Sequence, residues 1–152
     1  MKSEKADLWR SIGQINLDAL RRLASSLRNG VKCNASFPTD DQSLRGLAYG
    51  GLNVHVDVKF EDGKTWIARF RLLKINRPPT EKVNLDRISE VTVYQCLQRT
   101  SIPTPKVFGY GLDDDPDNPV GVGFILMEKV AGHPMDYRPR RQPHKSFMFT
   151  ER

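Results

Sequence analysis

One arginine of this sequence needs a chemical explanation, because it falls on the apolar face of a predicted strand. Residues 52–60 alternate apolar and polar side chains, which is typical of a half-buried strand, and a second strand is predicted over 65–72. Asp62-Gly63 between them favours a two-residue type I′ turn, because both central residues of that turn need positive φ. The resulting register places Arg69 opposite Val56. The same face then carries Val54, Val58 and Ile67. A guanidinium there requires a carboxylate, a phosphate or access to water, so Arg69 is a candidate binding residue.

Glu90 is the candidate partner for that arginine. A helix is predicted over 84–99, and on a 3.6-residue period Glu90 shares its side with apolar residues. These are Val93, Tyr94 and Leu97. A surface glutamate near a helix start, stabilised by the helix dipole, is the simpler interpretation. A bidentate contact with Arg69 would satisfy both charged groups at once, and we expect that pairing.

Composition and charge narrow the class of protein. The chain has 152 residues, 38% hydrophobic and 28% charged, as expected for one soluble domain with a modest core. No apolar run approaches the ~20 residues that span a bilayer, and residues 1–5 precede no apolar signal region. Cys33 and Cys96 lie in different predicted elements without metal-ligand spacing, which indicates free thiols and a cytoplasmic location.

The net charge of +6 does not by itself indicate a nucleic-acid binder. Residues 136–152 hold five basic and two acidic residues, so half of the excess lies in that irregular tail. No basic strand with interleaved aromatic residues and no recognition helix is evident elsewhere. A solvated basic tail is the favoured interpretation, and nucleic acid is an unlikely partner.

The N-terminal third is predicted to be helical and then irregular. Asn16 is a good N-cap for an apolar-periodic helix that ends at Asn29-Gly30, and the segment before it is either a shorter helix or an extended strap. Residues 33–42 are expected to form a loop. The glycine-bearing connection 44–51 could place backbone N–H groups over phosphates, but simple turn chemistry is the commoner use of such glycines.

The C-terminal half adds two strands, over 107–111 and 120–128, joined by an acidic turn at 113–119. That turn contains two prolines and lacks calcium-loop spacing, so it is expected to be solvated. The element order predicts an α+β fold: an antiparallel β-sheet with one packed helix, preceded by a helical segment. The expected divisions are an N-terminal helical segment and loop (1–43), the sheet unit (44–135) and a basic tail (136–152).

From Gly50 to Met135 the chain resembles the N-terminal lobe of the aminoglycoside phosphotransferase family, which is related to choline and protein kinases. The resemblance is carried by residues 63–70, 89–91, 101–107 and 124–132. It implies that Arg69 contacts ATP phosphates and that Glu90 holds it. It also implies a hinge whose backbone meets adenine and a set of pocket-lining side chains. The hinge would be Met127, Glu128, Lys129 and Val130, and the lining residues Val56, Ile67 and Ile125.

The family's catalytic groups are missing from this sequence. The family places its catalytic aspartate in an H-x-D-x-x-x-x-N loop of a second lobe, followed by a magnesium-binding aspartate. The histidines here, His55, His133 and His144, begin no such loop. We therefore expect a kinase-like N-lobe truncated before its catalytic lobe, which at most binds nucleotide weakly. A complete relative would use magnesium and transfer a γ-phosphate to a small-molecule hydroxyl.

The alternative is a non-enzymatic interaction module. In a complete kinase-like protein the apolar residues on the underside of the sheet and in the hinge strand would face nucleotide and the second lobe. Without that lobe they should form an exposed patch, so self-association is expected. The residues concerned are Val54, Val56, Val58, Ile67 and residues 124–127.

Overall fold

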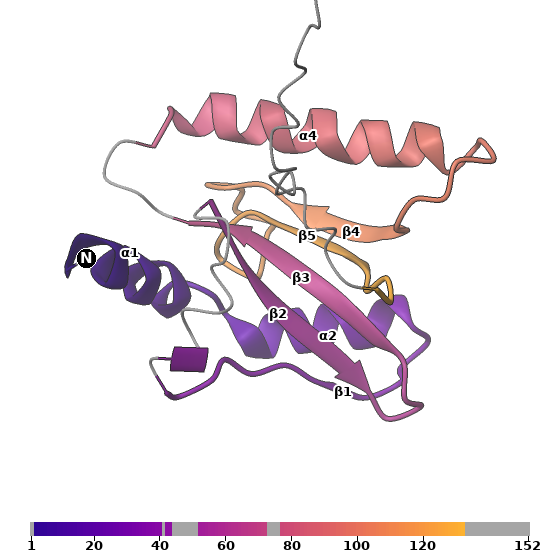
Figure 1. The fold of residues 1–152 in the computed structure, drawn as a ribbon, viewed down its shortest axis with the longest axis horizontal. Coiled ribbons are helices and arrows are strands. Elements are labelled where there is room, and N and C mark those ends of the chain that lie inside the picture. Colours follow the sequence, from indigo (N-terminus) through magenta and orange to yellow (C-terminus); the bar gives the residue numbers. More distant parts are fainter. Residues whose placement is uncertain (1, 41, 44–51, 73–76, 133–152) are drawn as a thin grey trace, which may run out of the picture.

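The computed structural model describes residues 2–40, 42–43, 52–72 and 77–132. Its elements are α1 (Lys2–Gly13), α2 (Leu17–Leu27), β1 (Cys33–Asn34), β2 (Asn53–Phe60), β3 (Thr65–Arg71), α4 (Thr80–Leu97), β4 (Val107–Gly111) and β5 (Phe124–Glu128). The strands form one antiparallel sheet of order β1-β2-β3-β5-β4, with α2 and α4 on opposite sides of it (Figure 1). The predicted α+β class is confirmed. No helix in the described ranges is both long and apolar enough to cross a membrane.

The N-terminal helices form as local sequence signals require. The Asn16 side chain accepts a hydrogen bond from the Ala19 N–H at 3.0 Å, which caps α2. The chain leaves α2 through Asn29 and Gly30, which both have positive φ. The prediction of this helix is confirmed, and the segment before it is the helix α1. Residues 33–34, expected in a loop, instead pair with the end of β2 as the short strand β1.

The β2–β3 hairpin has a three-residue turn, so the predicted two-residue type I′ turn is wrong. The Phe60 N–H donates to the Lys64 carbonyl at 2.9 Å, and Gly63 takes φ 84°. A type I turn followed by a left-handed glycine accepts Asp-Gly as readily as a type I′ turn does. The register shifts by one residue: His55, not Val56, lies opposite Arg69. Such a shift moves a side chain to the other face of the sheet.

The two faces of the sheet therefore differ from the expected ones. One face packs on α1 and α2 and is wholly apolar. It carries Val54, Val56, Val58 and Phe60 of β2, with Trp66, Ala68 and Phe70 of β3. The other face carries Arg69 and Ile67, and α4 covers its β5 side, where Val91 packs on Ile125 and Met127.

The expected exposed apolar patch is not formed, because every position named for it is buried except Ile67, which is half-buried. Val54, Val56 and Val58 are at most 2% exposed, because α1 and α2 pack on that face. Residues 124–127 are also buried, because β5 lies inside the sheet between β3 and β4. Any self-association must therefore use another surface.

The helix α4 begins at Thr80, earlier than the predicted residue 84, directly after Pro79. A proline fits a helix entry because the first helical N–H groups have no partner inside the helix. The inward positions are Val83, Arg87 and Val91. Val93, expected beside Glu90 on the packed side, is 56% exposed. The strand β4 has the predicted bounds, whereas β5 starts at Phe124 and residues 120–123 belong to the turn before it.

Candidate functional site

An ion pair joins the middle of the sheet to the packed helix. Arg69 Nη2 of β3 contacts Glu90 Oε1 of α4, and the two side chains are 20% and 37% exposed. The expected pairing is confirmed, although the reason for it changes. Arg69 reaches Glu90 because the one-residue shift puts it on the α4 side of the sheet, and not because it lies among the valines of β2.

A second ion pair lies on the same side of the sheet. Lys129 Nζ, just beyond β5, contacts Asp57 Oδ2 of β2 at 2.5 Å. Asp57 lies opposite Ile67 in the β2–β3 register, and Ile67 lies opposite Met127. Ile67 is therefore an apolar position on β3 between two pairs of opposite charge. This arrangement offers both an apolar contact and charged groups to a ligand with a flat apolar part and an anionic part.

Two of the three predicted adenine-lining residues, Ile67 and Ile125, lie together beside the predicted hinge residue Met127, and the third does not. Ile67, Ile125 and Met127 form one cluster with Val91, Tyr94 and Val107 of neighbouring elements. Ile125 and Met127 are only 2% and 6% exposed, so α4 already occupies much of the surface they could offer. Val56 lies on the opposite face, buried under the N-terminal helices. Its expected position beside Ile67 is wrong, for the register reason given above.

The predicted hinge residues lie at the open end of β5. The Glu128 N–H donates to the Lys106 carbonyl at 2.8 Å, and the Lys106 N–H donates to Glu128 Oε2 at 3.2 Å. Lys129 takes part in the ion pair with Asp57, and Val130 is 61% exposed. Glu128, Lys129 and Val130 are exposed and follow the buried Met127, at the same end of β5 as the Lys129–Asp57 ion pair.

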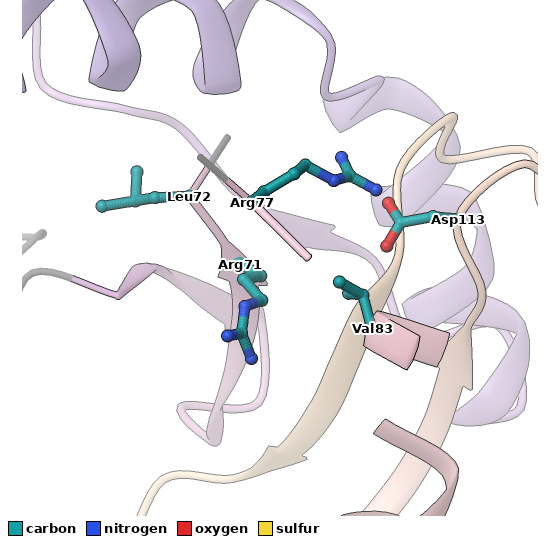
Figure 2. Close-up of a pocket in the computed structure, with 5 residues that line it drawn as sticks. All are labelled: Arg71, Leu72, Arg77, Val83 and Asp113. Atoms are coloured by element: carbon teal, nitrogen blue, oxygen red, sulfur yellow. The ribbon is translucent and has the colours of Figure 1, made fainter. Parts of the chain in front are cut away.

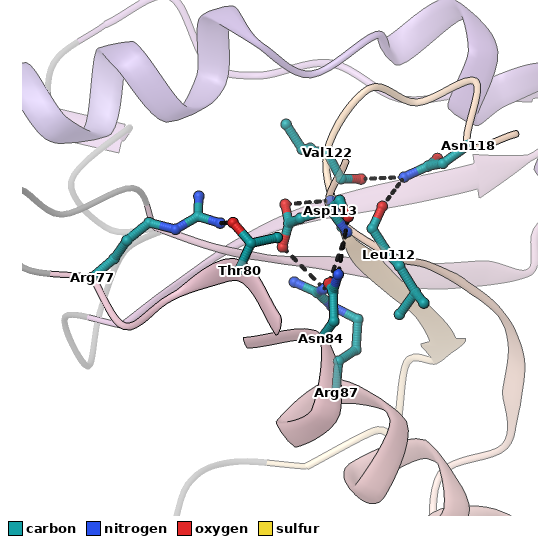
Figure 3. Close-up of polar contacts among 9 residues, drawn as sticks. Arg77, Thr80, Asn84, Arg87, Leu112, Asp113, Asn118 and Val122 are labelled. Carbon is teal, nitrogen blue, oxygen red and sulfur yellow. Dashed lines mark hydrogen bonds and ion pairs between the residues drawn. The ribbon is translucent and has the colours of Figure 1, made fainter. Parts of the chain in front are cut away.

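A buried polar network holds α4 to the turn before β5 (Figure 3). Arg87 Nη1 donates to Asp113 Oδ2 and to Asn84 Oδ1, each at 3.1 Å. The Asn84 side chain also makes two 2.9 Å hydrogen bonds with the Asp113 backbone. The second carboxylate oxygen of Asp113 accepts from the Gly123 N–H at 2.9 Å. The network therefore holds α4 in place against the turn. Because Glu90 lies on the same helix, its position relative to the sheet is fixed as well.

Sequence reasoning missed this network. The Asp113 and Arg87 side chains are only 12% and 7% exposed, so the expectation of a fully solvated acidic turn is wrong at Asp113. The signal for Arg87 was its spacing of four residues from both Val83 and Val91, which places it on the buried side of the helix. A side chain at Gly123 would put its Cβ 2.2 Å from Arg87 Nη1, so the guanidinium would have to leave its present position beside Asp113.

A small pocket lies at the start of α4, next to the network (Figure 2). Its lining residues are Arg71, Leu72, Arg77, Val83 and Asp113. Arg77 Nη2 donates to Thr80 Oγ1 at 3.3 Å, and its guanidinium points toward Asp113. Because Asp113 already pairs with Arg87, the lining has an excess of positive charge. Arg71 stands two residues after Arg69 on the same face of β3, so positive charge continues from the ion pair to this pocket.

Comparisons with known proteins give limited similarity. The chain matches no family model and no solved structure. Two curated proteins from two strains of Aspergillus fumigatus, each named subtelomeric hrmA-associated cluster protein, are 33% identical to it over 93 residues. The match covers 60% of this chain and 17% of each relative, so the chain spans only a small part of the length of the curated relatives it matches.

Proposed function

We propose that this chain binds the phosphate groups of an adenine nucleotide through Arg69, as the N-terminal lobe of an aminoglycoside-phosphotransferase-like kinase. The observation that carries the proposal is the ion pair between Arg69 of a central strand and Glu90 of the packed helix. A single arginine–glutamate contact across a sheet and a helix has a simple structural use as well. A ligand is favoured here because Arg69 has exposed hydrogen-bond donors and because a second arginine, Arg71, lies on the same face of the sheet.

The chemistry of the pair suits an anionic ligand. A guanidinium stays charged at all physiological pH values and has five donors in a fixed plane, which matches phosphate oxygens. Glu90 uses part of that fork and fixes its orientation, and the 20% exposure of Arg69 leaves the rest accessible. Arg71, with no ion-pair partner within the described part of the chain, adds positive charge beside it.

The rest of the face can hold the base of a nucleotide. Ile67 supplies an apolar surface beside the ion pairs, and the backbone of Lys129 and Val130, just beyond the end of β5, supplies donors and acceptors. ATP is the nucleotide that the family resemblance implies. Phosphoryl transfer also requires a catalytic carboxylate and metal-binding groups in a second lobe. We assign that step, with magnesium and a small-molecule hydroxyl acceptor, to a longer protein that contains this unit.

Nucleotide titration of the purified wild type and two variants tests the proposal. Arg69→Ala should weaken ATP binding about tenfold to a hundredfold, because a hydrogen bond to a charged group contributes roughly 1.5–3 kcal/mol. The matched control is Arg22→Ala, which removes one exposed arginine from α2 on the other side of the sheet and should leave the affinity unchanged. Adenosine should bind the wild type and Arg69→Ala alike. Equal ATP affinity in wild type and Arg69→Ala, with both folded, would contradict the proposal.

A further inference from the structure

A histidine lies directly opposite Arg69 on the neighbouring strand. His55 of β2 pairs with Arg69 of β3 in the hairpin register, and burial alternates along both strands. The valines of β2 face the N-terminal helices, so the half-buried His55 side chain projects from the same face of the sheet as Arg69. Residues opposite each other on one face have Cβ atoms about 4.5–5.5 Å apart. The imidazole is therefore within reach of a group that binds the Arg69 guanidinium.

The charged groups around His55 come from its own strand, from β3, from α4 and from the end of β5. They are Asp57, Arg69, Arg71, Glu90 and Lys129. Each of the two carboxylates already contacts one of the cations. Arg71, the diagonal neighbour of His55, forms no ion pair within the described part of the chain. Positive charge therefore exceeds negative charge around the imidazole, which suits an anionic ligand.

We propose that His55 is a second phosphate-contacting residue, which binds the ligand in its protonated form together with Arg69. This inference rests on the proposed nucleotide site. A neutral imidazole has one N–H donor, whereas the imidazolium has two. Where one ring nitrogen is engaged within the protein, protonation supplies a donor at the other. The resulting hydrogen bond to a phosphate oxygen joins two charged groups and is stronger than a bond between neutral ones.

The two residues contribute to binding in different ways. Arg69 stays charged throughout the physiological pH range, so its contribution does not depend on pH. An ordinary histidine side chain titrates near pH 6.5, and an anion beside it favours the charged form. The contribution of His55 is therefore fully present at low pH and is lost as the pH rises through the titration of the imidazole in the complex. Phosphate binding should accordingly be tighter at pH 6 than at pH 8 by a factor that depends on His55.

ATP titration at pH 6 and at pH 8 tests this role. The terminal phosphate itself titrates near pH 6, so each variant is compared with the wild type at the same pH, where that effect is shared. His55→Gln keeps a polar side chain that cannot become charged. It should bind ATP about five- to tenfold more weakly than the wild type at pH 6 and within about twofold of it at pH 8. Adenosine, which has no phosphate, should bind both proteins equally at either pH.

A second substitution at the same position gives an independent comparison. His55→Lys places a cation there that remains charged at both pH values. It should bind ATP several-fold more tightly than the wild type at pH 8 and about equally at pH 6. A variant that merely disturbed the strand would not bind more tightly at either pH. Far-ultraviolet circular dichroism confirms that each variant is folded under both conditions.

The matched control is Lys59→Gln, which removes a positive charge from the same face of the same strand. Lys59 is exposed and lies four residues beyond His55, about 13 Å away, next to the hairpin turn. Its replacement should leave the ratio of the ATP affinities at pH 6 and pH 8 unchanged. The control separates a direct contact at His55 from a general effect of positive charge on this face.

Three results would overturn the role of His55. They are an equal factor between wild type and His55→Gln at both pH values, the same pH 6 loss in Lys59→Gln, and no gain in His55→Lys at pH 8. If Arg69→Ala still weakens ATP binding in that case, the proposed nucleotide site stands and the assignment of His55 alone fails. Absence of ATP binding by the folded wild type at both pH values would instead overturn the nucleotide site and this inference together.

Discussion

Replacing Arg87 by alanine is expected to lower the free energy of unfolding by about 3–5 kcal/mol, the usual cost of removing one partner of a buried ion pair. The change leaves the Asp113 carboxylate, only 12% exposed, with the Gly123 N–H but without its cation. It also removes the hydrogen bond to Asn84. Urea denaturation followed by far-ultraviolet circular dichroism measures the difference.

The control for this variant lies one turn away on the same helix. Lys82 forms an ion pair with Asp86 at 3.0 Å, but both side chains are well exposed, at 63% and 43%. Lys82→Ala should therefore change the free energy of unfolding by less than about 0.5 kcal/mol. A loss in Arg87→Ala no larger than that of Lys82→Ala would show that the network does not hold α4 to the sheet.

Replacing Trp66 by alanine is expected to cost about 3–5 kcal/mol of folding free energy, as large-to-small changes of buried aromatic residues do. Trp66 is 6% exposed and stacks on Phe108 with ring centroids 3.8 Å apart. It also meets Phe60 edge-on at 4.8 Å, and the Arg28 guanidinium lies 5.7 Å from its ring. One side chain therefore ties β2, β3 and β4 together.

The other tryptophan of the chain is the natural comparison. Trp9 lies on α1 and is 43% exposed, so Trp9→Ala removes the same number of atoms from a largely solvated position. Its cost should be well below that of Trp66→Ala in the same denaturation experiment. Similar losses for the two variants would mean that Trp66 is not the buried anchor that the ring contacts indicate.

Much of the fold followed from local patterns. The alternation over 52–60 predicted β2, Asn16 and Gly30 predicted the ends of α2, and Pro103 with Pro105 separated α4 from β4. The pairing of Arg69 with Glu90 was also predictable, because both are charged groups at positions where water alone is a poor partner. These features depend on neighbours in sequence or on a simple charge argument.

The hairpin register was the main error of the prediction, although the sequence contains a pattern that indicates the correct register. Along β3 one alternate set is wholly apolar, Trp66, Ala68 and Phe70, and the other contains Arg69 and Arg71. Matching that apolar set to the valines of β2 gives the observed register, whereas the turn dipeptide alone fits two loop lengths.

Contacts between residues that are distant in sequence could not be predicted from local sequence patterns. The partner of Arg87 is Asp113, 26 positions away in a turn of several acidic residues, and no local signal distinguishes it from its neighbours. Likewise, the burial of Val54, Val56 and Val58 depends on α1 and α2 reaching back over the sheet. Only the three-dimensional arrangement shows that helices cover this face of the sheet.

Backbone amide chemical-shift mapping during nucleotide titration tests the central claim most directly. The account predicts that ATP shifts the signals of Ile67, Arg69 and Glu90 together with those of residues 127–130, in one saturable transition. Adenosine should shift only Ile67 and residues 127–130, because it lacks the phosphates that Arg69 contacts. No saturable shift at Arg69 and Glu90, or ATP-induced shifts confined to the α1 and α2 side of the sheet, would contradict it.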